Sequence, residues 1–279
     1  MAKRILVPLD GSDYSKNAVK VAIDMALKTD GTVIGLGIID RDEIEDSTMG
    51  AGIGASYFAE HLEQHKLNDA IKKIKYFLED FEELCKSAKV KYEVYKKSGV
   101  PFEMIVELGK TSDIIIIGIK TFFHFETSPK DGETLKDLLE VNVCPIIAVP
   151  KTEVRMTGNI LLAADGSVKS AKAMRVFTHI SRNNANIKKI FVLNVSDNMD
   201  ESQILLEGVD KYLKTHGFNV ETFTRVGKPY KEIIKFSEEK DIGLIVMGAY
   251  GNSDLSALLF GRTSLKVIEH GEIPVFFYH

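Results

Sequence analysis

The sequence predicts an α/β protein made of two tandem, doubly wound parallel sheets. Three observations support this prediction. A short apolar run that ends in Asp-Gly-Ser occurs twice, at residues 10–12 and again at residues 165–167. In both halves, apolar runs typical of buried parallel strands alternate with helical patterns. The chain has 279 residues, which is long enough for two ordinary domains. Alternation of this kind predicts a parallel sheet with helices on both faces.

The early elements of the two halves correspond closely. Each begins with an apolar strand, a helix with an i, i+3, i+4 apolar stripe, and a second β-branched strand. The expected first strands cover residues 4–9 and 159–164, and the second strands cover residues 32–39 and 189–195.

The repeat resumes later with Gly-Val-Pro-Phe at residues 99–102 and Gly-Lys-Pro-Tyr at residues 227–230. A proline at this place is typical of a helix start. We expect helices at 102–109 and 230–238, fourth strands at 114–117 and 244–247, and last strands at 145–149 and 274–277. The predicted domains are therefore residues 1–151 and 152–279, with five strands each.

The first half carries extra material. Residues 40–60 have five acids and one base in their first seven positions and contain Gly50, Gly52 and Gly54, which favours a surface loop, with a lid as the alternative. A long helix is expected at 57–88, with a core stripe that includes Leu62, Ile71, Ile74, Leu78, Phe81 and Cys85. His61 and His65 are four residues apart on this helix, but no third metal ligand stands out.

A glycine pattern follows the fourth strand of the second half. Gly248, Gly251 and Gly261 are spaced as G-x2-G-x9-G, and Arg262, Thr263 and Ser264 lead into a helix. Glycines allow a ligand close to the backbone, and the amides of a helix N-terminus attract anions. The pattern predicts a phosphate-binding loop. The alternative is a glycine loop that only turns the chain.

This pattern resembles the ATP-binding motif of the universal stress protein family, and the resemblance covers nearly the whole chain as a tandem pair of domains. Arg262 departs from the motif, because the family has Ser or Thr directly after the third glycine. The resemblance implies a Rossmann-like, adenine nucleotide α-hydrolase-like fold, with the two sheets related by a pseudo-twofold axis. It also implies that an adenine nucleotide (ATP, ADP or AMP) lies across the strand ends of the second domain.

The resemblance assigns roles to individual residues of the second half. Asp165 would bond the ribose hydroxyls or a magnesium ion carried by the nucleotide, although an N-cap is the alternative for an Asp before a helix. Val195 would read adenine through its backbone. The implied nucleotide-binding residues are Ala163, Asp165, Val195, Gly248, Gly251, Asn252, Gly261, Arg262, Thr263 and Ser264.

The corresponding motif of the first half is degenerate. Asp10, Gly118 and Gly132 are retained, but Thr121 occupies the position of the middle glycine. A β-branched residue disfavours positive φ, and the aromatic residues at 122, 123 and 125 would crowd a phosphate. We expect the first pocket to be closed or unable to bind a triphosphate.

Composition and missing motifs exclude several other functions. The net charge is −4 and there is no basic run, so nucleic acid is not an expected partner. The chain has no apolar run long enough for a membrane span, no signal-peptide core and two isolated cysteines, which suits a reduced cytoplasm. It has no P-loop. Pro8 and Ala163 occupy the positions where haloacid-dehalogenase-type phosphatases need their nucleophilic Asp.

The leading hypothesis is a cytoplasmic adenine-nucleotide-binding stress protein that acts on an unknown protein partner. No general base is evident near the glycine loop, so we expect no catalytic residue and at most weak ATP hydrolysis. The alternatives are a slow ATPase or nucleotidyl-transferring enzyme, and a scaffold that binds no nucleotide. The apolar last strands of the two halves should pair within the chain, and a homodimer is a further expectation.

Overall fold

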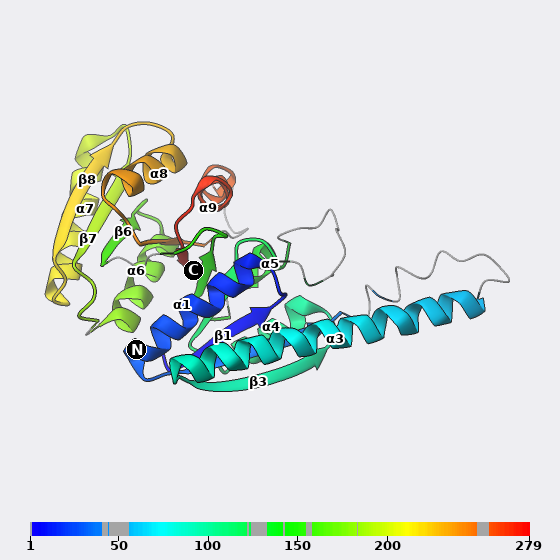
Figure 1. The fold of residues 1–279 in the computed structure, drawn as a ribbon. Coiled ribbons are helices and arrows are strands. Elements are labelled where there is room, and N and C mark those ends of the chain that lie inside the picture. Colours follow the sequence, from blue (N-terminus) through cyan, green and yellow to red (C-terminus); the bar gives the residue numbers. More distant parts are fainter. Residues whose placement is uncertain are drawn as a thin grey trace. The chain divides into compact units, whose positions relative to one another are not determined.

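The computed structural model describes residues 2–40, 44, 56–121, 123, 133–141, 143–154, 158–182, 184–249 and 257–279, with the backbone alone at 56–59, 133 and 257–262. Two compact units make up the chain, Ala2–Leu138 and Leu139–His279 (Figure 1). This division falls before the predicted domain boundary at residue 151.

The unit Ala2–Leu138 contains a parallel sheet with the strand order β3-β2-β1-β4. Its strands are β1 (Arg4–Leu9), β2 (Thr32–Ile39), β3 (Lys91–Ser98) and β4 (Ile114–Gly118). Its helices are α1 (Asp13–Thr29), α3 (Ser56–Ala88) and α4 (Pro101–Gly109), and α5 (Glu133–Val141) crosses the boundary. The central strands are almost wholly buried because they carry continuous apolar runs.

Helix α3 covers β2 and β3 with only its second part. Ala70, Ile74, Leu78, Phe81 and Cys85 are buried, whereas Leu62 is 48% exposed. Figure 1 shows the first turns of α3 extending beyond the strands of this unit. The predicted core stripe is therefore correct from Ile74 onward and wrong at Leu62.

Two glycines of β2 allow α3 to lie close to the sheet. A Cβ at Gly35 would come 2.6 Å from the Phe81 ring, and one at Gly37 would come 2.7 Å from Ile74. Ordinary Cβ contacts are longer than this, so any larger side chain would push the helix away from the sheet.

The unit Leu139–His279 has the strand order β5-β10-β9-β6-β7-β8. Its strands are β5 (Ile146–Val149), β6 (Asn159–Ala163), β7 (Lys189–Val195), β8 (Val220–Arg225), β9 (Leu244–Gly248) and β10 (Val275–Tyr278). The pairs are parallel except β5 with β10, where Ile147 lies opposite Phe276 in an antiparallel pair. The predicted pairing of the two last strands is confirmed.

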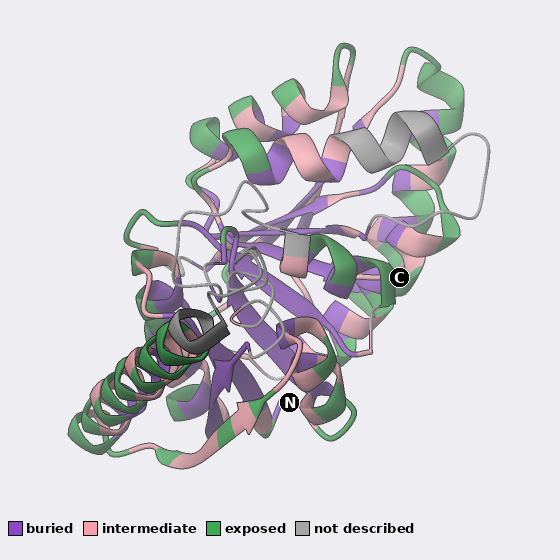
Figure 2. Ribbon diagram, turned by 90° about the vertical axis from the view of Figure 1, so that its right-hand side faces the viewer, coloured by how far each residue is buried: buried purple, intermediate pink, exposed green. Residues whose placement is uncertain are grey.

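The helices of this unit are α6 (Val168–Ser181), α7 (Met199–Thr215), α8 (Pro229–Glu239) and α9 (Ala257–His270). Aromatic rings fill the space between helices and sheet. Phe177 and Phe276 meet edge to face with ring centres 5.6 Å apart, and Phe191, Phe223 and Phe236 form a second cluster. Figure 2 shows buried strands between helices whose outer faces are exposed. The predicted fold class, doubly wound parallel α/β, is confirmed.

In the part of the chain that the structure describes, no helix is both long enough and apolar enough to cross a membrane.

Candidate functional site

The candidate site lies where the winding of the second sheet reverses. Strand β6 has β7 on one side and β9 on the other, and Ile160 is in register with both Ile190 and Leu244. Because these strands are parallel, the loops after β6 and β9 leave the same edge of the sheet. Ligands of doubly wound sheets bind at this edge.

Asp165 follows β6 and is exposed to solvent. Its Oδ1 accepts a hydrogen bond from the Ser167 N–H at 2.9 Å. The helix cap is Ser167, whose Oγ accepts from the Ser170 N–H at 3.1 Å. The N-cap alternative for Asp165 is therefore wrong, because its carboxylate closes the turn before the cap. Within the described residues, Oδ2 of Asp165 has no hydrogen-bond partner, so this oxygen is available to a ligand.

Gly248 brings the end of β9 against the first turn of α6. A Cβ at this position would lie 2.9 Å from the backbone N of Ser170 and 3.1 Å from Cβ of Lys169. The glycine therefore permits a close approach of two backbones. This contact holds the end of β9 next to the helix that follows the Asp165 turn.

The remaining residues of the glycine motif are described unevenly. Gly251 and Asn252 lie outside the described residues, and only the backbone is described at Gly261 and Arg262. Thr263 is half-buried. Ser264 is buried, with 2% of its surface exposed.

Helix α9 begins at Ala257, four residues before Gly261, whereas the sequence led us to expect a helix that begins after this glycine. The reason is local, because Ala257, Leu258 and Leu259 favour a helix. The amide of Gly261 lies inside the helix, so the free amides of its N-terminus belong to earlier residues.

Ala163 and Val195 end the two strands beside the Asp165 turn. The Ala163 carbonyl accepts a hydrogen bond from Ser170 Oγ at 3.4 Å, and Val195 is half-buried. The structure adds Asn194, which sequence reasoning missed. Its Nδ2 donates to the Ala164 carbonyl at 2.7 Å in the interior, so it ties β7 to the residue just before Asp165. The available signal was an amide within the apolar run FVLNV.

The amide oxygen of Asn194 is buried. In the part of the chain that the structure describes, this Oδ1 has no hydrogen-bond partner. Buried polar atoms are usually paired, so an orphan acceptor beside the turn marks Asn194 as functionally interesting.

The corresponding turn of the first unit is covered. Asp10 is 7% exposed, and its Oδ1 accepts from both the N–H and the Oγ–H of Ser12, at 2.9 and 2.6 Å. A Cβ at Gly11 would overlap the Phe77 ring of α3, whereas a Cβ at Gly166 would meet, among the described residues, Leu205 alone, at 3.7 Å. Phe77 therefore lies directly on the first turn, and no described residue covers the second turn in this way.

Little space remains between α1 and α3 near the first turn. The cavity there has a volume of about 50 Å³ and is lined by Gly11, Phe77 and their neighbours. Thr121 and Phe123 are buried, with 6% and 2% of their surfaces exposed, and His124 lies outside the described residues.

The described residues contain no group of three or more His, Cys, Asp or Glu side chains that could hold a metal ion. Both histidines of α3 are exposed, and Nδ1 of His65 lies 3.2 Å from the Asp69 carboxylate. This contact is an ordinary surface pair on one helix face.

Comparisons with known proteins identify the family. The model of the universal stress protein family matches residues 1–121 and 156–279. The universal stress protein Slr1230 of Synechocystis is 27% identical, over 98% of both chains. The universal stress protein MJ0531 of Methanocaldococcus jannaschii is 29% identical, over 42% of this chain and 78% of its own.

Among solved structures, a universal stress protein of Archaeoglobus fulgidus superposes with a TM-score of 0.75 at 20% identity, covering 99% of this chain and 95% of its own. This likeness concerns the fold. Since the family model matches both repeats and most of the residues, the chain belongs to the universal stress protein family.

Proposed function

We propose that the protein binds one adenine nucleotide at the carboxyl ends of β6 and β9, and that occupancy of this site regulates a partner protein. The observation that carries the proposal is the contrast between the two Asp-Gly-Ser turns. Asp165 is exposed and keeps one carboxylate oxygen unpaired among the described residues, whereas Asp10 is buried and Phe77 lies on the neighbouring Gly11. Membership of the universal stress protein family agrees with this choice.

Each residue of the proposed site has a chemical task. Oδ2 of Asp165 would accept hydrogen bonds from the ribose hydroxyls, or would hold a magnesium ion carried by the phosphates. The backbone of Val195 would read adenine, and Asn194 would keep the Asp165 turn in place through the Ala164 carbonyl. The glycine segment after β9 would bind the phosphates together with the early amides of α9.

The proposed role is binding rather than turnover. The Asp165 carboxylate already accepts a hydrogen bond from the Ser167 N–H. The described residues of this turn contain no second acid or histidine that could serve as a general base. A slow ATPase and a scaffold without ligand are the two competing functions. Each of these two functions predicts a result in a nucleotide titration that differs from the result expected for simple binding.

Isothermal titration with ATP, ADP and AMP, with and without Mg²⁺, tests the proposal. We expect one nucleotide per chain, and a loss of affinity of at least about tenfold in Asp165→Ala, equal to about 1.4 kcal/mol. The matched control is Asp10→Ala, which should keep wild-type affinity. Steady ATP hydrolysis that disappears in Asp165→Ala would support the enzyme instead. No heat and no rise in Tm at millimolar nucleotide would support the scaffold.

A further inference from the structure

Strand β8 is the edge of the sheet in the unit Leu139–His279, and its outer side presents unpaired backbone groups. Among the described residues it pairs with β7 alone. The carbonyls of Asn219 and Arg225 accept from β7 and the loop that follows it, at 2.8 and 2.9 Å. In a parallel strand successive residues point their N–H and C=O to opposite sides. Val220, Thr222 and Thr224 therefore direct theirs outward.

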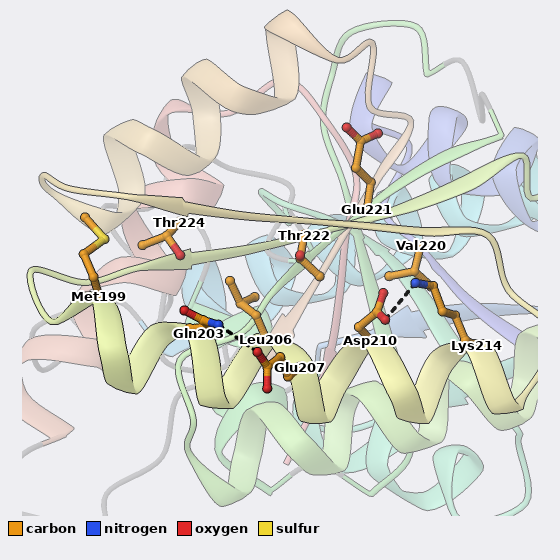
Figure 3. Close-up of a pocket in the computed structure, with 10 residues that line it drawn as sticks. All are labelled: Met199, Gln203, Leu206, Glu207, Asp210, Lys214, Val220, Glu221, Thr222 and Thr224. Carbon is orange, nitrogen blue, oxygen red and sulfur yellow. Dashed lines mark hydrogen bonds and ion pairs between the residues drawn. The ribbon is translucent and has the colours of Figure 1, made fainter.

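A hollow runs beside this edge. It has a volume of about 630 Å³ and lies between β8 and α7, as Figure 3 shows. The strand contributes Val220, Glu221, Thr222 and Thr224, and all of these except Glu221 direct their backbone groups outward. A strand added at this edge could therefore form hydrogen bonds with the unpaired backbone groups of β8. Its side chains could occupy the hollow.

We propose that the occupant is β8 of a second copy of this chain, paired antiparallel about a twofold axis at Phe223. In this register Thr222 of one copy lies opposite Thr224 of the other, and both have outward backbone groups as the hydrogen-bonded pairing requires. Glu221 lies opposite Arg225, and the two Phe223 side chains face each other. Opposite charges, aromatic pairs and hydroxyl pairs are the favourable cross-strand combinations.

The surrounding charges suit the same twofold. Glu221 forms an ion pair with Lys189 at 3.0 Å, so this end of the strand carries a cation beside its acid. Arg225 is held by Glu239 and by Glu232, the latter at 3.5 Å, so the other end carries acids beside its base, with Lys235 and Lys240 also near Glu239. The twofold brings the Lys189 end of each copy to the Glu239 end of the other.

The other edge strand that the structure describes is a poorer self-partner. In the same relative register on β3, Glu93 would lie opposite Lys97 as Glu221 lies opposite Arg225, but Val94 would lie opposite Lys96, and Lys91 adds a further cation to the strand. Lysines on an edge strand are a common protection against edge-to-edge pairing. Strand β8 has one acid and one base and lacks this protection.

Two single charge reversals provide a sharp test. Glu221→Arg places two arginines opposite each other at both ends of the pair, and Arg225→Glu places two glutamates there. By sedimentation at high micromolar concentration, wild type should be dimeric, and each variant alone should dimerise at least about tenfold more weakly. Mixed in equal amounts, the two variants should form a heterodimer, because every cross-strand charge pair is then opposite. If the mixture dimerises as weakly as each variant alone, the proposal is overturned.

Thr222→Pro tests the backbone pairing without the charges. Proline removes an outward N–H that the monomer does not use, so edge strands tolerate it, and the variant should fold but not dimerise. Lys97→Glu on β3 is the matched control and should remain a dimer. Circular dichroism and Tm confirm folding of each variant, and if Arg225→Glu unfolds, the other three decide. A monomeric wild type, or a dimer unaffected by Thr222→Pro, rejects the interface.

Discussion

The turns after β1 and β6 have the same sequence, Asp-Gly-Ser, and nearly the same backbone, since φ is 77° at Gly11 and 79° at Gly166. They differ in what lies above them. In the first unit the Phe77 ring of α3 covers the glycine, and in the second the described residues leave the position open apart from Leu205. The comparison teaches that one motif can have its glycine covered or left open, depending on the helix that packs over it.

The largest expected effect is a difference between Gly11→Ala and Gly166→Ala in the free energy of unfolding that each variant loses. Both hold a positive φ, which costs any other residue about 1–2 kcal/mol, so Gly166→Ala should lose this amount. Gly11→Ala must also displace Phe77, and overpacking typically adds about 1–3 kcal/mol, giving roughly 2–5 kcal/mol in total. Chemical unfolding of both variants measures the difference. Equal losses would show that Phe77 moves aside without cost.

Removing the cover itself is the next test. Phe77→Ala should lower the free energy of unfolding by about 1–3 kcal/mol, because the ring is only half-buried. We expect nucleotide titration of this variant still to give one site per chain, since Thr121 replaces the motif glycine of the first half. A stoichiometry of two would show that Phe77 alone closes the first turn. Leu205→Ala, the matched change in α7, should leave the stoichiometry at one.

A third test uses the cysteine of α3. Burial, helped by the charge of Glu82, raises the pKa of the Cys85 thiol to about 12. A thiol whose pKa is raised on folding stabilises the protein fully below the unfolded pKa, and this contribution declines as pH rises through the alkaline range. Above about pH 9 the free energy of unfolding should fall by about 1.4 kcal/mol per pH unit more than in Cys85→Ala.

Hydrogen exchange should place this alkaline loss in the unit Ala2–Leu138, where Cys85 packs on the sheet. The same alkaline slope in wild type and Cys85→Ala would contradict the prediction.

The smallest effect concerns the strand beside the second turn. Asn194→Ala removes a buried hydrogen bond to Ala164, but it also removes an orphan acceptor, so we expect a loss of only about 1 kcal/mol. Thr178→Val is a useful contrast, because the Thr178 hydroxyl is likewise buried and unpartnered within the described chain. It should be neutral or stabilising. A neutral Asn194→Ala would remove the support for Asn194 as the residue that positions the turn.

Much of the fold could be predicted from the sequence because its central strands are continuous apolar runs. The bounds of β1, β2 and β7 agree with the expected ranges. Strands β3 and β8 could not be delimited in this way, because the sequences KYEVYKKS and VETFTR are polar at most positions, as suits an edge strand. Periodicity also failed at Leu62, since a helix pattern does not show where the sheet beneath it ends.

The candidate site was less predictable than the fold. The repeated Asp-Gly-Ser located both turns, but the cap is the serine and not the aspartate, because the side chain that caps a helix depends on the turn geometry. Phe77 follows Gly11 by 66 residues, and only tertiary packing places it on that glycine. Asn194 acts through a single hydrogen bond to the neighbouring strand, and no sequence spacing encodes this contact.

The place of β5 affects how the protein can be dissected. This strand ends the first sequence repeat, yet it pairs with β10 inside the second compact unit. A fragment that starts at residue 152 lacks β5, so the backbone groups of β10 that pair with β5 would be unpaired. A fragment that stops at residue 151 would contain β5 (Ile146–Val149) without β10. Either truncation should be prone to aggregation. The two sequence repeats are therefore not independent domains, because the last strand of the first repeat belongs to the sheet of the second.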